Sequence, residues 1–367
     1  MTAHELDARL LAAIADWNAG GTGYDEAAFG EHALALFAHQ IACNRPYASY
    51  AEALGFSAAQ PPASWREIPA VPSSAFKDAV LAAFDVANAE LEFHTSGTTA
   101  ERAGRHLVER AELYDAAALA GFDRYMLADR PLIRFLNLVP DPQARKRSSL
   151  GYMVGLVSSL RGDGAGGFFL DGDAIDVAGF SAALSASIVE ERAVSITGTA
   201  FAFVALLDAL DSAGGRFAAP PGSRIMETGG FKGRTRVVPR EELYARLEDR
   251  FGIPQEAIVA EYGMTELLSQ FYDDPSSRAS MTRVKVAPPW LRTLIVDGDG
   301  DEVPFGNVGF LRHVDLANRS SVAAIQTEDR GYAAQGGFVL LGREIDAEPR
   351  GCSLDAEALL ALREVAR

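Results

Sequence analysis

The chain is poor in lysine and has fewer basic than acidic residues. Of its 367 residues, 34 are lysine or arginine and 50 are aspartate or glutamate, so the formal net charge is −16. Nucleic-acid phosphates and anionic lipid headgroups are bound by basic surfaces. The charge balance therefore argues against nucleic acid and against a membrane surface as partners. Only 4 of the basic residues are lysines, so each lysine can be considered individually.

The chain has two cysteines and no long apolar run. Cys43 and Cys352 are too few for a disulfide framework or a zinc site. The first residues lack a basic stretch followed by an apolar one, so no signal peptide is expected. The sequence holds no run of 18 apolar residues, so no membrane span is predicted. These features predict a reduced, cytoplasmic protein in which Cys43 packs at the end of a helix.

The hydrophobic pattern changes along the chain and predicts four segments. Residues 1–90 are predicted to be a helical segment packed on the core, because apolar residues recur at helical spacing over 34–41. Residues 91–280 alternate short β-branched or aromatic runs with helical runs, which predicts an α/β core whose parallel sheet is covered by helices on both faces. Residues 281–352 are predicted to form a small β-rich subdomain, and residues 353–367 a short C-terminal tail.

A run of hydroxyl side chains around a glycine follows the extended residues Leu91–Phe93. Hydroxyl groups and backbone amides in a glycine-containing loop can surround phosphate oxygens. The run is not a Walker P-loop, because no Gly-Lys-Ser/Thr follows it. A polar turn between two strands is the competing interpretation. The candidate phosphate-binding residues are Thr95, Ser96, Gly97, Thr98 and Thr99.

A second glycine-containing turn begins with Tyr262 and Gly263, directly after an apolar run. It ends on an acidic side chain, and Mg²⁺ prefers one or two carboxylates together with phosphate oxygens. Glu266 is therefore the candidate metal ligand, and Thr265 can offer a hydroxyl to an α-phosphate. A carboxylate that stabilises a helix N-terminus is the alternative for Glu266. Ligands bind at the carboxyl ends of parallel strands, so both glycine-containing motifs are expected at that edge of the sheet.

Two further polar segments suit other parts of a nucleotide. Gly229 and Gly230 allow a flat base to approach the backbone closely, and Lys232 follows them. A flexible turn with solvent-facing cations is the alternative there. Asp329 offers a carboxylate to a ribose diol, and Arg343 follows a glycine further along. A surface turn is the alternative for Asp329.

The order and separation of these segments resemble the adenylate-forming superfamily of acyl-CoA synthetases, luciferases and peptide-synthetase adenylation domains. Residues 95–99 match its phosphate loop, residues 262–266 match its Tyr-Gly-x-Thr-Glu motif, and Asp329 and Arg343 match its ribose-binding residues. Within the superfamily, the chain is similar to the LuxE-like acyl-protein synthetases over nearly its whole length. The supporting stretches are residues 36–40, 68–77, 198–199, 227–234 and 350–354.

The resemblance implies a ligase that uses ATP and Mg²⁺ to convert a carboxylic acid into an acyl-adenylate, with release of pyrophosphate. The implied contacts are residues 95–99 with the β- and γ-phosphates, Gly229 and Gly230 with the adenine, Thr265 and Glu266 with the α-phosphate and Mg²⁺, and Asp329 and Arg343 with the ribose. The superfamily's C-terminal domain, which normally supplies a catalytic lysine, is expected to be missing, and no lysine follows Lys285. Either an arginine or Lys232 takes the place of that lysine, or another chain helps, or adenylation is slow.

The resemblance also draws attention to Cys352. LuxE-like enzymes are thought to carry the acyl group on a cysteine near the C-terminus before passing it to a partner. Thiolate attack on an activated acyl group is ordinary covalent catalysis, and Arg350 can lower the pKa of the thiol. A small buried residue that anchors the tail is the alternative for Cys352.

The leading hypothesis is an acid–thiol ligase that activates a carboxylic acid, with a fatty acid as the candidate, and passes the acyl group to a thiol. The thiol is that of Cys352, that of an acceptor protein (a reductase or a carrier), or both in turn. A second hypothesis keeps the adenylation but takes an aromatic or small acid from a secondary pathway, with transfer to coenzyme A or a carrier protein. A third is a non-catalytic regulatory protein that binds a nucleotide or an adenylate. The sequence does not indicate which acid, which acceptor or which oligomeric state applies.

Overall fold

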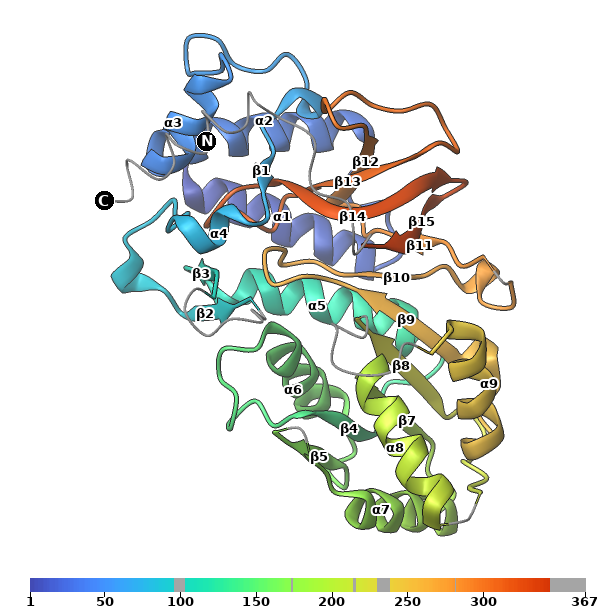
Figure 1. The fold of residues 1–367 in the computed structure, drawn as a ribbon. Coiled ribbons are helices and arrows are strands. Elements are labelled where there is room, and N and C mark those ends of the chain that lie inside the picture. The colour runs from blue at the N-terminus through green and yellow to red at the C-terminus, as the bar shows by residue number, and fades with distance from the viewer. Residues whose placement is uncertain (96–102, 173, 214–215, 230–237, 281, 344–367) are drawn as a thin grey trace. The chain divides into compact units, whose positions relative to one another are not determined.

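The computed structural model describes residues 1–95, 103–172, 174–213, 216–229, 238–280 and 282–343 (Figure 1). The chain forms two compact units, each assembled from separate segments. The first unit comprises Met1–Ala120, Met264–Gln270 and Val286–Arg367, and the second comprises Gly121–Gly263 and Phe271–Lys285. The limits of the four predicted segments differ from these units and stay a prediction.

A mostly parallel sheet forms the centre of the second unit. Its strands lie in the order β10 (Phe271–Asp273), β9 (Ile258–Tyr262), β8 (Arg224–Thr228), β7 (Val194–Thr199), β4 (Arg134–Pro140), β5 (Gly167–Asp171) and β6 (Ala174–Ile175). The five strands from β9 to β5 run parallel, whereas β10 and β6 pair antiparallel with β9 and β5. The parallel sheet predicted for an α/β core is therefore confirmed.

Helices cover both faces of this sheet. They are α6 (Ser149–Arg161), α7 (Val177–Val189), α8 (Ala200–Ala213) and α9 (Arg240–Phe251), together with the end of α5 (Ala111–Met126) (Figure 1). Successive side chains of a strand point to opposite faces, so β4 serves both layers. Leu136 and Leu138 belong to one apolar core with α7, α8 and α9, whereas the ring of Phe135 packs on Phe122 of α5. Among the helices that the structure describes, none is long and apolar enough to cross a membrane.

The first unit begins with three helices whose starts are encoded locally. They are α1 (Ala3–Asn18), α2 (Glu26–Cys43) and α3 (Arg45–Ala53). Thr2 and Glu5 form a reciprocal capping box on α1, and Asp25 and Asn44 cap α2 and α3 through their side chains. The predicted helix end at Cys43 is correct, but the prediction that the thiol is packed is wrong. Cys43 is exposed, because it lies on the last residue of α2, where the chain turns away.

An antiparallel sheet completes the first unit. Its strands lie in the order β12 (Leu291–Val296), β13 (Val308–Asp315), β14 (Ala324–Ala334) and β15 (Gly337–Gly342), and the short β1 (Val71–Pro72) pairs parallel with β14. The β-rich character predicted after residue 280 agrees with this sheet. The interpretation of Asp329 as a surface turn is wrong, because the residue lies buried within β14. The polar run of residues 326–330 conceals the strand, although its side chains alternate between buried and less buried positions.

The hairpin of β2 (Leu91–His94) and β3 (Arg105–Val108) is a separate two-stranded antiparallel sheet in the first unit. The expectation that both glycine-containing motifs follow strands of the parallel sheet is therefore wrong for residues 95–99. A hairpin needs only a loop between its strands, whereas a parallel pair needs a crossover of a dozen or more residues. The short extended run directly after the loop lets β3 pair back on β2.

Candidate active site

The base of the predicted phosphate loop is closed by Thr95. Its amide donates to the carbonyl of Gly104 at 2.9 Å, and its Oγ1 accepts from the amide of Gly104 at 2.8 Å. A Cβ on Gly104 would lie 3.0 Å from Cγ2 of Thr95 and 3.1 Å from the carbonyl carbon of Phe76, so a larger residue would crowd this junction. Thr95 and Gly104 therefore hold the two ends of the hairpin together at the base of the loop. Ser96, Gly97, Thr98 and Thr99 lie outside the described residues.

The segment that carries Thr265 and Glu266 is held by His106 of β3. The Nδ1 atom of His106 lies 2.8 Å from the carbonyl oxygen of Thr265, and its Nε2 atom lies 2.8 Å from Oγ of Ser321. Complete burial lowers the pKa of His106 to about 4, so the ring is neutral at pH 7. A carbonyl can only accept, so Nδ1 carries the proton and the Ser321 hydroxyl donates to Nε2. His106 thus connects the strand after the phosphate loop to the second motif.

The connector between β13 and β14 holds the same segment from its other side. Asn318 donates to the carbonyl of Glu266 at 2.8 Å and accepts from the amide of Leu268 at 3.0 Å. The buried Asp315 carboxylate accepts from the amides of Leu268 and Ser269 at 3.1 and 2.9 Å. Three backbone groups that no regular strand satisfies are therefore paired by two side chains: the carbonyl of Glu266 and the amides of Leu268 and Ser269.

Gln40 of α2 in turn holds this connector. Its Nε2 donates to the carbonyl of Asn318 at 2.8 Å, and its Oε1 accepts from the amide of Ala323 at 3.0 Å. This contact gives a structural reason for the stretch of residues 36–40 noted in the sequence. No comparable pattern in the sequence marks His106, Asp315 or Asn318, because their partners are backbone groups that lie far from them along the chain.

The carboxyl group of Glu266 is buried near three charged side chains of the first unit. Only 8% of Glu266 is exposed, and burial raises the pKa of its carboxyl to about 7. The positive charges of Arg343 and Lys77 act in the opposite direction, and the negative charge of Asp329 adds to the rise. The structure therefore brings together three predicted site residues, Glu266, Asp329 and Arg343. It adds Lys77, which the sequence offered only as part of a supporting stretch.

Asp329 and Arg343 form an ion pair across β14 and β15. The Nε atom of Arg343 lies 2.9 Å from Oδ1 of Asp329, and the pairing of Arg330 with Gly342 sets them side by side. The amide of Asp329 donates to Oγ1 of Thr327 at 3.1 Å, which orients the strand locally. These contacts fix the direction of the Asp329 side chain.

The remaining predicted residues, apart from Cys352, belong to the second unit. Gly229 directly follows β8 with φ +69, a conformation that favours glycine, and it is exposed. Tyr262 ends β9, where its ring lies 5.5 Å from that of Phe271 across the antiparallel pair with β10. Gly263 follows and ends this part of the unit. Gly230 and Lys232 lie outside the described residues, as does Cys352.

Lys285 has a structural role in the second unit. Its Nζ donates to Oδ1 of Asp273 at 2.9 Å and to the carbonyl of Ala260 at 2.6 Å. The other oxygen of Asp273 lies 3.0 Å from Nη1 of Arg283. Buried charges need partners of this kind, so Lys285 is committed to holding β9 and β10.

Glu261 of β9 gives the second unit a measurable dependence on pH. Thr228 of β8 donates a hydrogen bond to its Oε2, and burial raises the pKa of Glu261 from 4.5 to about 7. The native state therefore binds more protons than the unfolded state between these pH values, so stability falls as pH rises through 7. The substitution Glu261→Gln keeps an acceptor for Thr228 but cannot titrate. We therefore expect the free energy of unfolding of this variant to decrease by about 3 kcal/mol less than that of wild type over this pH range.

Urea unfolding of both proteins at pH 5 and pH 8 measures this difference. The control is Glu256→Gln, because Glu256 is exposed in the neighbouring 3₁₀ turn of Gln255–Ala257. Its unfolding free energy should follow the wild-type values at both pH values. Equal pH dependence in wild type and Glu261→Gln would contradict the assignment.

The donor set around Glu266 suits Mg²⁺ held jointly with a nucleotide. Among the described residues, no group of three or more His, Cys, Asp or Glu side chains is arranged to hold a metal ion by itself. Mg²⁺ is usually bound by one or two carboxylates plus substrate phosphates, so a single buried carboxylate fits this chemistry. Glu266 is the residue that would hold the ion.

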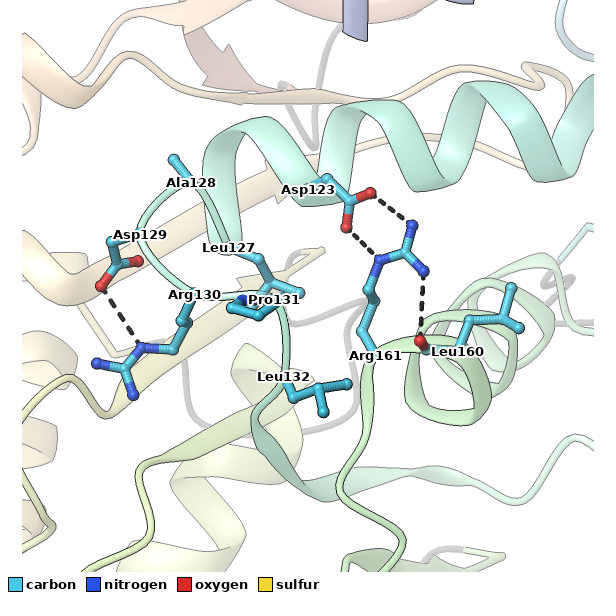
Figure 2. A pocket seen from close by; sticks show the side chains of 9 residues that line it. All are labelled: Asp123, Leu127, Ala128, Asp129, Arg130, Pro131, Leu132, Leu160 and Arg161. Carbon is cyan, nitrogen blue, oxygen red and sulfur yellow. Dashed lines mark hydrogen bonds and ion pairs between the residues drawn. The ribbon is translucent and has the colours of Figure 1, made fainter. Parts of the chain in front are cut away.

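A pocket of about 710 Å³ lies elsewhere in the second unit (Figure 2). Figure 2 shows that its charged side chains form ion pairs with one another. The Nε and Nη2 atoms of Arg161 each donate to one carboxylate oxygen of Asp123, both at 2.7 Å, and Nε of Arg130 donates to Asp129. Its lining residues 127–132 lead into β4 and therefore lie at the amino end of that strand. Parallel sheets bind ligands at the opposite edge, so this pocket is not the candidate site.

Comparison with known proteins identifies a family and a fold. The model of the family described as "Acyl-protein synthetase, LuxE" matches residues 11–360. Among curated proteins, no sequence match is found. A similar solved structure is ATP-bound MatB from Rhodopseudomonas palustris, with 16% identity, a TM-score of 0.50 and coverage of 71% of this chain and 49% of that one. Another is McyG A-PCP with phenylalanyl-adenylate, with 17% identity, a TM-score of 0.51 and coverage of 71% and 48%.

These likenesses confirm the predicted fold class. At such low identity they show the fold alone. The chain spans about half the length of the solved structures that it matches.

Proposed function

Because the chain belongs to the LuxE acyl-protein synthetase family, we propose that it activates a carboxylic acid with ATP and transfers the acyl group to a thiol. In the first half-reaction, a carboxylate oxygen attacks the α-phosphorus of ATP. The bond from that phosphorus to the bridging oxygen breaks, and pyrophosphate leaves with the electron pair. The products are an acyl-adenylate and pyrophosphate.

The single observation that carries this proposal is the grouping of Glu266 with Asp329 and Arg343 in the first unit. In ATP, the ribose is joined directly to the α-phosphate. A residue that binds the ribose and a residue that serves the α-phosphate must therefore lie close together. Asp329 meets the first requirement, and Glu266 and Thr265 meet the second.

The chain has little covalent work to do in this half-reaction. It must align the acid with the α-phosphorus and neutralise negative charge, and both effects lower the barrier. Thr95 to Thr99 are proposed to hold the β- and γ-phosphates, and Gly229 and Gly230 to flank the adenine. Mg²⁺ held by Glu266 would supply additional neutralisation of phosphate charge.

In the second half-reaction, the thiolate of Cys352 is proposed to attack the acyl carbon. The bond from that carbon to the AMP oxygen breaks, AMP leaves with the electron pair, and the thiol proton passes to solvent. The resulting thioester would then be passed to an acceptor protein, a reductase or a carrier. Family membership and the position of Cys352 in the sequence support this step.

An ATP–pyrophosphate exchange assay with a panel of fatty, aromatic and small carboxylic acids tests the proposal. Exchange that depends on one class of acid is the expected result, and that class names the substrate. A fatty-acid preference supports the acyl-protein synthetase route, whereas an aromatic preference supports transfer to coenzyme A or a carrier protein. ATP binding by calorimetry without exchange for any acid would instead support a regulatory nucleotide-binding protein.

A further inference from the structure

The backbone of Lys77 lies near the base of the predicted phosphate loop. It lies on the short helix α4 (Ala75–Asp78), directly after Phe76. The carbonyl carbon of Phe76 is the atom that a Cβ on Gly104 would approach to 3.1 Å, and the ring of Phe76 packs 5.3 Å from that of His106. Helix α4 therefore packs against β3 beside Gly104, one of the two residues that close the junction.

Lys77 also lies within electrostatic range of Glu266. Its positive charge lowers the pKa of the Glu266 carboxyl, against the larger effect of burial. One short helix therefore brings a cation near two elements that are assigned to the nucleotide: the base of the phosphate loop and the proposed metal-binding carboxylate.

Lys77 differs from the other cations near these elements in having no committed partner. Arg343 is paired with Asp329 at 2.9 Å, and Arg105 is paired with Glu92 at 2.9 Å. The ammonium group of Lys77 forms no hydrogen bond or ion pair with another residue in the described part of the chain, and the residue is exposed. An exposed ammonium without a partner keeps its charge available for a ligand.

The other lysines are not comparable. Lys285 is buried and committed to Asp273 and Ala260. Lys146 is exposed in the turn before α6, in the second unit. Lys232 lies outside the described residues. Among the lysines that the structure describes, Lys77 is therefore the one placed beside the assigned nucleotide elements.

We propose that Lys77 is a catalytic cation that contacts the triphosphate of ATP and neutralises the charge that develops on the leaving pyrophosphate. When the bond between the α-phosphorus and the bridging oxygen breaks, negative charge grows on the β-phosphate oxygen. A triphosphate also carries more negative charge than one Mg²⁺ ion neutralises. An ammonium group near the phosphate loop neutralises part of that charge when it contacts the triphosphate. This inference rests on the proposed adenylation.

The test compares wild type with Lys77→Ala, Lys77→Arg and the matched control Lys146→Ala. Each protein is assayed for ATP–pyrophosphate exchange, with ATP and acid varied separately, and its thermal midpoint is measured. We expect Lys77→Ala to lower kcat/KM for ATP by about 10- to 100-fold, the usual effect of one charge-assisted contact to a phosphate. The KM for the acid and the thermal midpoint should not change, Lys77→Arg should recover most of the activity, and Lys146→Ala should resemble wild type.

Three outcomes would overturn the assignment. Wild-type kinetics in Lys77→Ala would remove any role in catalysis. A loss confined to the KM for the acid would make Lys77 a contact of the substrate carboxylate instead. An equal loss in Lys77→Arg together with a lowered thermal midpoint would make its role structural.

Failure of the proposed function can be recognised separately. If wild type exchanges pyrophosphate with no acid, calorimetric titration with Mg-ATP replaces the kinetic readout. Weaker binding of Mg-ATP by Lys77→Ala than by Lys146→Ala would then uphold the Lys77 contact although adenylation fails. Equal binding by the two variants, or no binding by wild type, would reject it.

Discussion

Replacement of Glu266 by glutamine is expected to slow ATP–pyrophosphate exchange by about 100-fold or more. The substitution keeps the size of the side chain but removes the charge that a Mg²⁺ ion and its nucleotide require. Loss of one group that stabilises developing charge in a water-excluded site costs about 100- to 1,000-fold in rate. Because the carboxyl is buried and its pKa is raised to about 7, the glutamine should not reduce folding stability. Exchange kinetics at saturating acid, with Mg²⁺ varied, measure the effect.

The matched control is Glu52→Gln. Glu52 is an exposed glutamate on α3, in the same unit of the chain. It should retain wild-type exchange and wild-type dependence on Mg²⁺. Exchange by Glu266→Gln within a few-fold of wild type would show that Glu266 serves neither the α-phosphate nor the metal. The buried carboxyl would then have a structural role only, and not that of a helix cap, because Glu266 lies in a turn that leads to β10.

Replacement of Cys352 by alanine is expected to abolish covalent labelling by radiolabelled acid while leaving pyrophosphate exchange unchanged. Exchange reports only the formation of the acyl-adenylate, which needs no thiol. The label requires a thioester, and a thiolate is the nucleophile that forms it. Hydroxylamine cleaves thioesters, so the wild-type label should be released by hydroxylamine.

The chain supplies its own control for this experiment, because Cys43 is its one other cysteine. Cys43 is exposed on α2, so it is accessible to reagents and to activated acyl groups. Cys43→Ala should retain the full label. Label that persists in Cys352→Ala and disappears in Cys43→Ala would move the acyl site to α2. Label that persists in both variants would argue against a cysteine thioester.

Much of the second unit is predictable from local pattern. β-branched and aromatic runs alternate with helical runs from β4 to β9, and such alternation leaves a parallel sheet as the simplest way to bury both faces. The helix starts at Thr2, Asp25 and Asn44 are also local, because each cap bonds an amide within three residues. Errors arose where the pairing partner lies far along the chain or where burial is not periodic. The sequence around Asp329 in β14 suggested a surface turn, and Cys43 was predicted to be packed; both predictions are wrong.

The residues of the candidate site also fall into those that local sequence indicates and those that only tertiary contacts indicate. Residues 95–99, residues 262–266, Asp329 and Arg343 carry recognisable chemistry in their own sequence neighbourhoods. Lys77 and His106 do not, because a single lysine or histidine beside apolar residues has no distinctive pattern. Their relevance depends on contacts over long sequence separations, such as the 2.8 Å hydrogen bond between His106 and the carbonyl of Thr265.

The sequence by itself determined the predicted reaction class, ATP-dependent activation of a carboxylic acid, because the motifs behind it are local. They are the hydroxyls around a glycine in residues 95–99, the Thr-Glu pair after the turn at residues 262–266, and the carboxylate of Asp329. Only the tertiary structure decided which charges meet. It set Glu266 near Asp329, Arg343 and Lys77, and it committed Lys285 to Asp273. The physical reason is that electrostatic and hydrogen-bonding environments depend on distance in space and on burial, and neither follows from spacing along the chain.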